Sequence, residues 1–141
     1  MALADEQSTL DAIEATAARH RELAGILSPV IAAHSEHVRL LAEAVPAASD
    51  TASDTGASAS PSPSASSPTE QGVRRYRVPR EPQAALSLLS ENEQDLSTST
   101  KRHAFVAKSG PFARLLASMA ASAAQHAVLL DRPLPTKQAG R

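Results

Sequence analysis

Apolar residues recur at helical spacing in four stretches of the chain. Steps of three and four residues place side chains on one face of a helix. The last stretch, over residues 111–130, contains small residues in the middle of such a face and one histidine inside it. Its members are Phe112, Leu115, Met119, Ser122, His126 and Leu129. This spacing predicts a helix that packs one face against its neighbours.

The first stretch predicts a helix over about residues 5–27. Its face consists of Leu10, Ile13, Ala17, His20, Ala24 and Leu27. Ser28 and Pro29 follow, and serine with proline favours the start of another helix. We therefore expect a second helix over about 29–45, folded back on the first as an antiparallel hairpin because the connection is short. Its inner face would contain Val30, His34, Val38 or His37, Leu41 and Val45.

A third helix is predicted over about residues 82–108. Its face consists of Leu86, Leu89, Glu93, Leu96, Thr100, His103 and Ala107. Gly110 and Pro111 separate it from the last helix, because glycine ends helices and proline begins them. Residues 46–81 between the two hairpins begin with a tract rich in Ser, Pro and Ala. That composition predicts a disordered crossover linker within one four-helix domain spanning 1–141.

Composition supports an all-α fold. Only 2% of the 141 residues are aromatic, whereas β-sheets are enriched in aromatic and β-branched side chains. The net charge is −1, so no overall field favours nucleic acid. The absence of cysteine excludes disulfides and thiolate metal ligands.

Two further patterns concern membranes and anions. No apolar run reaches the roughly 20 residues that cross a bilayer, and the first ten residues lack the pattern of a signal peptide. Four arginines surround Tyr76 between Arg74 and Arg80. We expect this segment to pack against acidic helix faces such as Glu91 and Asp95; contact with phosphate, an anionic headgroup or a partner is the alternative.

Each predicted helix carries a histidine or a carboxylate inside its apolar face, and the direction of the third helix decides which of them meet. If that helix runs antiparallel to the second, Glu93 pairs with His126, and His103 joins His20 and His34. If the linker crosses the full bundle, the third helix runs parallel to the second. His20, His34, Glu93 and His126 then gather near one end.

Three imidazoles and a carboxylate suit one divalent ion such as zinc or iron. The candidate ligands are His20, His34, Glu93 and His126. The alternative is that these histidines hydrogen-bond across the helix seams without metal. The HSEH sequence places His34 and His37 side by side on the helix surface. No nucleophile signature or glycine-rich loop accompanies it, so we predict no catalytic residue and no enzyme.

Two antiparallel hairpins joined by a long crossover, with polar residues in every helix, resemble the ferritin-like fold. The closing segment SGPFARLLASMAASAAQHAVLL is similar to the end of ferritin-like domains in exported proteins and lipoproteins of high-GC Gram-positive bacteria. The resemblance implies a di-iron site in which two helices each supply Glu-x-x-His and the other two each supply one Glu.

The chain departs from that pattern at both paired positions. Ala123 stands three residues before His126, and His34 stands three residues before His37, while Glu14 and Glu93 could supply the single carboxylates. Ferroxidase activity is therefore not expected. We predict a non-catalytic ferritin-like accessory or interaction domain, with a mononuclear metal-binding or storage module as the alternative. A homodimer or protein partner is expected, and the resemblance favours the cell envelope over the cytoplasm.

Overall fold

The computed structural model describes residues 1–44 and 76–134, which form helices and short connections. The elements are α1 (Ala2–Arg19), a short 3-10 helix η1 (Arg21–Leu23), α2 (Ala24–Ala44), α3 (Pro82–Val106) and α4 (Gly110–Leu130). These residues contain no strand, which confirms the all-α class for this part of the chain. None of the helices described is both long and apolar enough to cross a membrane.

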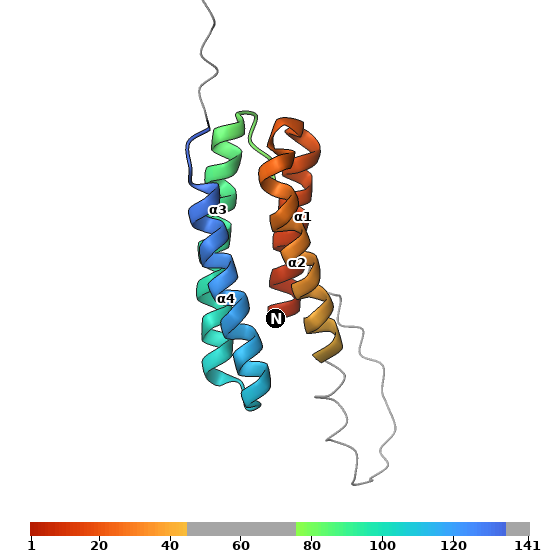
Figure 1. Cartoon of the computed structure of the whole chain (residues 1–141), viewed down its shortest axis with the longest axis vertical. Coiled ribbons are helices and arrows are strands. Elements are labelled where there is room, and N and C mark those ends of the chain that lie inside the picture. Colours follow the sequence, from red (N-terminus) through yellow and green to blue (C-terminus); the bar gives the residue numbers. More distant parts are fainter. Residues whose placement is uncertain (45–75, 135–141) are drawn as a thin grey trace, which may run out of the picture.

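The four helices lie along one common axis (Figure 1). α1 packs beside α2, and α3 packs beside α4. α1 also contacts α3, and α2 contacts α4, so each helix has two packing neighbours. α2 and α3 both begin at the upper end of Figure 1 and run downward. The segment between them, residues 45–75, lies outside the described residues, as does most of the predicted linker; Tyr76–Glu81 are irregular.

Apolar side chains form two separate clusters in the core. One is centred on buried residues of all four helices and η1: Ile13, Leu23, Leu27, Leu86, Leu89 and Leu130. The other contains Leu41, Leu116 and Met119, with Leu3, Ala104 and Phe112 packed against it. Each helix contributes residues to both clusters, and between these residues in the sequence it carries a histidine or glutamate. These residues are Glu6 on α1, His34 on α2, Glu93 on α3 and His126 on α4.

The predicted turn at Ser28–Pro29 is wrong. α1 ends at Arg19, the chain reverses through His20 and η1, and Pro29 lies inside α2. A proline inside a helix costs about 3 kcal/mol because it lacks an N–H and crowds the preceding turn. Reversal at His20 instead puts Leu23, Leu27 and Val30 on one inner face, each no more than 1% exposed. Burying each such side chain contributes about 1.5–3 kcal/mol, so together they outweigh the local proline signal.

The second hairpin follows the sequence signals closely. α3 begins at Pro82, and the side chain of Ser109 caps α4 by accepting a hydrogen bond from the Phe112 N–H. The inner face of α4 is rotated slightly from the predicted one. Its buried residues are Leu116, Met119, Ala120, Ala123, Ala127 and Leu130, while the predicted members other than Met119 are half-buried.

The rotation of α4 is explained by close packing against α3. The hydroxyl of Ser90 donates to the Ala127 carbonyl at 2.9 Å, and the hydroxyl of Ser97 donates to the Ala120 carbonyl at 2.8 Å. Only small side chains on α4 let a serine of the neighbouring helix reach the backbone. The alanines therefore face α3, and the larger residues of the predicted stripe lie to the side.

Candidate metal centre

A hydrogen-bonded chain of three ionisable side chains crosses the core. His34 of α2 lies between Glu6 of α1 and Glu93 of α3, with each ring nitrogen 2.7 Å from a carboxylate oxygen. All three side chains are no more than 1% exposed. An ionised carboxylate only accepts hydrogen bonds, so both ring nitrogens donate and His34 is an imidazolium.

The pKa values agree with this assignment. Burial alone lowers the pKa of His34, but its hydrogen bonds to Glu6 and Glu93 outweigh burial and raise that pKa to about 9. Burial raises the pKa of the Glu6 carboxyl, whereas the hydrogen bond from His34 and the nearby ring of His37 lower it, and the net shift is downward. At neutral pH the raised pKa therefore makes His34 an imidazolium, and the lowered pKa makes Glu6 a carboxylate.

Two further histidines flank this chain. His37 of α2 places Nδ1 3.4 Å from Oε1 of Glu6, and His126 of α4 places Nδ1 3.9 Å from Oε2 of Glu93. Burial, together with the nearby charges of His34 and His37, lowers the pKa of His126 despite the opposing effect of Glu93. We call Glu6, His34, His37, Glu93 and His126 the polar layer.

Four atoms of the polar layer are buried and have no hydrogen-bond partner among the described residues. They are Oε1 of Glu6, Nδ1 of His37, Oε2 of Glu93 and Nδ1 of His126. Buried polar atoms almost always have a partner, so four unpaired atoms in one layer need an explanation. They face one another as two oxygen–nitrogen pairs, one on each side of His34.

The spacing of these pairs suits cation ligands. A tetrahedral zinc ion with ligands at about 2.0–2.1 Å separates neighbouring ligand atoms by roughly 3.4 Å. Within each pair, the nitrogen and the oxygen are 3.4 Å apart (His37 and Glu6) and 3.9 Å apart (His126 and Glu93). Both distances are longer than the common range of N–H···O hydrogen bonds. Two groups of three residues each offer ligand atoms that lie within 4.8 Å of one another: Glu6, His34 and His37, and His34, Glu93 and His126.

Charge balance also favours a cation. Two buried carboxylates against one imidazolium leave the layer with one net negative charge, which is costly in an apolar core. A divalent ion that replaces the added proton of His34 makes the layer neutral. The layer thus has both the donor atoms and the charge to hold one such ion.

Three of the four predicted ligands lie in the polar layer, and the fourth does not. His34, Glu93 and His126 come together, which agrees with a third helix that runs in the same direction as the second. His20 belongs to neither ligand group; its Nε2 lies 2.9 Å from the Pro79 carbonyl oxygen and its Nδ1 3.5 Å from Glu22. The prediction for His20 assumed a turn at Pro29. Because the chain reverses at His20 instead, this residue ends α1.

Sequence reasoning missed Glu6 and His37. Glu14, the predicted carboxylate of the first helix, is exposed, whereas Glu6 is buried. Glu6 precedes Leu10 and Ile13 by steps of four and three residues, so it continues their face, and this signal could have identified it. His37 was predicted either on the inner face or at the surface, and not as a ligand; its side chain is only 14% exposed.

The polar layer does not fit the carboxylate-bridged di-iron site that the ferritin-like resemblance implies. Glu6 of α1 and Glu93 of α3 supply one carboxylate each, but the residues three before His37 and His126, where that site would need glutamates, are His34 and Ala123. Ala123 is 1% exposed and offers no ligand atom, while His34 lies between the two carboxylates. The layer therefore has two carboxylates where that site uses four.

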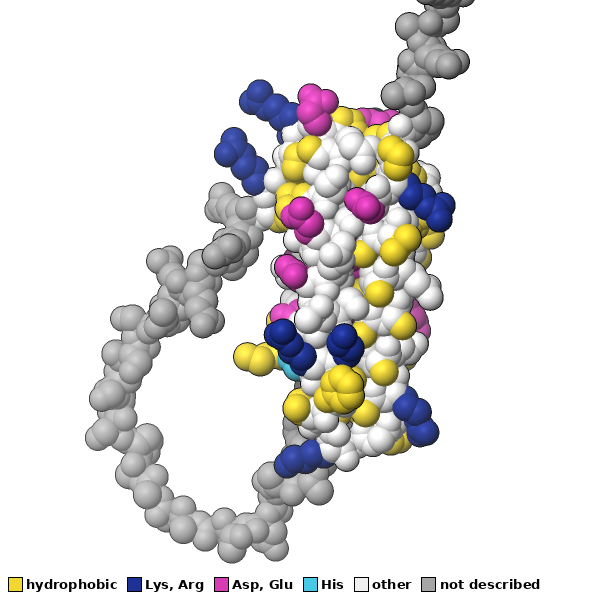
Figure 2. Space-filling model, turned by 90° about the vertical axis from the view of Figure 1, so that its left-hand side faces the viewer, with side chains coloured by type: hydrophobic (Ala, Val, Ile, Leu, Met, Phe, Trp, Pro, Cys, Tyr) yellow, Lys and Arg dark blue, Asp and Glu magenta, His cyan; other side chains and the backbone are white. Residues whose placement is uncertain are grey.

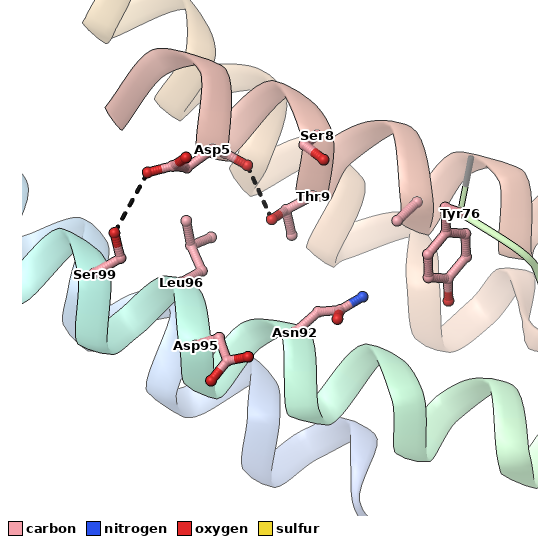
Figure 3. Close-up of a pocket in the computed structure, with 9 residues that line it drawn as sticks. Asp5, Ser8, Thr9, Tyr76, Asn92, Asp95, Leu96 and Ser99 are labelled. Carbon is pink, nitrogen blue, oxygen red and sulfur yellow. Dashed lines mark hydrogen bonds between the residues drawn. The ribbon is translucent and has the colours of Figure 1, made fainter. Parts of the chain in front are cut away.

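A groove of about 440 Å³ runs between α1 and α3 (Figure 3). Its lining includes two carboxylates, Asp5 and Asp95. The other lining residues are Ser8, Thr9, Ala12, Tyr76, Asn92, Leu96 and Ser99. A hydrogen bond of 3.4 Å from Ser99 to Asp5 joins the two helices across it. No residue of the polar layer lines this groove.

Two other predicted features lie away from the polar layer. His103 lines a largely apolar cavity of about 300 Å³ with Met1, Leu41 and Phe112, and it belongs to neither ligand group. Arg77 and Arg80 are exposed and form no ion pair with Glu91 or Asp95 among the residues described. The remaining arginines of that segment, residues 74–75, lie outside the described residues.

No protein-family model matches this chain, and no curated protein or solved structure does.

Proposed function

We propose that this protein is a ferritin-like helical bundle that binds one divalent transition-metal ion in its polar layer. The observation that carries the proposal is the set of four unpaired atoms facing one another around His34. Three imidazoles and two carboxylates form a mixed nitrogen and oxygen donor set, which suits zinc or ferrous iron. The role would be binding or storage of the ion rather than catalysis.

The arrangement of the helices supports the ferritin-like part of this proposal. Each of the four helices contributes to the polar layer, and an apolar cluster lies on either side of it. α2 and α3 run in the same direction in Figure 1, as a crossover between two hairpins requires. The cell envelope remains our predicted location, on the resemblance of the closing segment alone.

Elemental analysis of protein purified without chelator tests the proposal directly. We expect close to one zinc or iron per chain and a lower melting temperature after chelation, because an ion bound only to the folded state stabilises it. Added zinc should restore the melting temperature. The H103A variant is the matched control, since His103 is a half-buried histidine outside both ligand groups. Protein that is metal-free and unaffected by zinc or chelator would contradict the proposal.

A second candidate function, the non-catalytic accessory or interaction domain, is favoured by apolar residues at the end of α3. Phe105 and Val106 are 83% and 77% exposed. Figure 2 shows hydrophobic side chains beside basic ones at this lower end of the bundle. Self-association through this end would appear as a dimer in sedimentation experiments, and F105S with V106S should abolish it. A wild-type protein that stays monomeric at high concentration would argue against a homodimer.

A further inference from the structure

The polar layer consists of two halves that share one residue. The Glu6 half-centre comprises Glu6, His37 and Nδ1 of His34; the Glu93 half-centre comprises Glu93, His126 and Nε2 of His34. Each half has its own carboxylate and its own outer histidine. Only the ring of His34 belongs to both.

A neutral imidazole can coordinate only one ion. It has one nitrogen with a free lone pair and one nitrogen that carries hydrogen, and the hydrogen bond of the second nitrogen fixes which one coordinates. If Nδ1 of His34 binds an ion with Glu6 and His37, then Nε2–H keeps its hydrogen bond to Glu93. If Nε2 binds an ion with Glu93 and His126, then Nδ1–H keeps its hydrogen bond to Glu6.

We propose that the two half-centres are alternative positions for a single ion, and that His34 makes them mutually exclusive. This inference rests on the proposed metal-binding function. In either position the carboxylate of the empty half accepts the remaining N–H of His34. Such an outer carboxylate orients a ligating histidine and increases its basicity. Each half-centre thus serves the other as its supporting carboxylate.

Charge supports single occupancy over double occupancy. The two charges of one divalent ion offset those of the two carboxylates when His34 is neutral, so the buried layer is then neutral. Two divalent ions would require His34 to lose both ring hydrogens, and the layer would still carry a net positive charge. Uncompensated charge between two apolar clusters is costly, so the second ion is excluded.

Single-histidine variants test the inference because they disable one half-centre at a time. H37A removes a ligand of the Glu6 half-centre, and H126A removes a ligand of the Glu93 half-centre. Neither side chain hydrogen-bonds within the Glu6–His34–Glu93 chain, so both variants should keep the helical circular dichroism of the wild type. H103A is again the control. The probe is Co²⁺, titrated by calorimetry and visible absorption, with stoichiometry measured by elemental analysis.

We expect the wild type, H37A and H126A each to bind one Co²⁺ per chain. One of the two half-centres should bind Co²⁺ more tightly in the wild type. The variant that lacks a ligand of this half-centre should bind Co²⁺ more weakly, and its absorption spectrum should be that of Co²⁺ in the other half-centre. The double variant H37A/H126A should lose more than about 100-fold in affinity, because outer-shell partners alone are worth about 10–100-fold. H103A should match the wild type.

Three results would overturn the inference, and they are distinguishable. Two Co²⁺ ions per wild-type chain, falling to one in each single variant, would establish a dinuclear centre. Loss of binding in both single variants, with one ion in the wild type, would establish one centre that needs all five residues. Absence of binding in a folded wild type would overturn the proposed function itself, and this inference with it.

Discussion

The polar layer and the two apolar clusters are built from the same four helices but contribute to the protein in opposite ways. The clusters stabilise the fold by burying apolar area. This stabilisation does not depend on one exact alignment of neighbouring helices, because the hydrophobic effect has no preferred direction. The polar layer contains two carboxylates and an imidazolium, all no more than 1% exposed. Removing such charges from water costs several kcal/mol per ion, and their mutual attraction only partly offsets this. The polar layer therefore contributes little to the stability of the fold. Its residues are better explained as ligands of a binding site.

The largest effect should follow from H34A, which leaves two carboxylates facing each other in the core. We expect the free energy of unfolding to fall by about 3–5 kcal/mol, as when one partner of a buried ion pair is removed. L89A in the apolar cluster should cost about 2–5 kcal/mol through the cavity it creates. Urea unfolding measures both. A cost below about 1 kcal/mol for H34A would mean that the Glu6–His34–Glu93 chain is not charged as described.

The metal-free protein should also lose stability as the pH rises from about 6.5 to about 9. The pKa of His34 is raised to about 9 in the folded state, whereas an unfolded histidine titrates near 6.5. The folded state therefore binds the His34 proton more tightly than the unfolded state does. The resulting contribution to the free energy of unfolding is fully present below pH 6.5 and is lost as the pH rises through about 9. The loss is on the order of 3 kcal/mol at most, because one pKa unit corresponds to about 1.36 kcal/mol.

The lowered pKa of Glu6 acts at the other end of the pH range. The ionised Glu6 stabilises the folded state above pH 4.5, the ordinary pKa of a glutamate carboxyl. This stabilisation is lost as the pH falls through the lowered pKa of Glu6. The lowered pKa of His126 also removes stability as the pH falls below 6.5, because the unfolded histidine then binds the proton more tightly. Urea unfolding of chelator-treated protein between about pH 4 and 10 should therefore show maximal stability near pH 6.5. An unchanged free energy of unfolding between pH 6.5 and 9 would rule out the imidazolium assignment for His34.

The smallest loss of stability, and the sharpest comparison, comes from converting the polar layer to apolar residues. The triple variant E6M/H34L/E93M replaces the charged chain with side chains of similar volume. We expect it to be as stable as the wild type or up to about 4 kcal/mol more stable, as when buried ion networks elsewhere are replaced by packed hydrophobic residues. It should also bind no Co²⁺ and show no stability change between pH 6.5 and 9. A strongly destabilised triple variant would make the charges a requirement of the fold.

Local signals account for the parts of the fold that the sequence predicted well. Pro82, the Ser109 cap and Gly110 are boundary signals that depend on neighbouring residues only, and α3 and α4 begin within one residue of the predicted positions. The buried residues of α3 include Leu86, Leu89, Glu93, Leu96 and Thr100, all members of its predicted face. A periodic pattern this regular determines which side of a helix faces inward, whatever the helix packs against.

The candidate site was predicted only in part, because it depends on the register between helices. Glu6 meets His34 since Glu6 lies 14 residues before His20 and His34 lies 14 residues after it, and the chain reverses at His20. A reversal at Pro29 would have paired different residues. The choice between these two turns depends on a few kcal/mol: the burial of leucine and valine side chains favours reversal at His20, and the proline favours reversal at Pro29. The burial contribution arises only when the four helices pack together.

The sequence by itself determined four amphipathic helices, each with a polar residue inside its apolar face, because helical periodicity and capping are local properties. Only the tertiary structure decided that Glu6 replaces Glu14, that His37 is half-buried, and that His20 lies outside the polar layer. The physical reason is that ligand groups form between residues distant in the chain. Their meeting is set by where the hairpin turns and in which direction α3 runs, and both are decided by which apolar faces can be buried together.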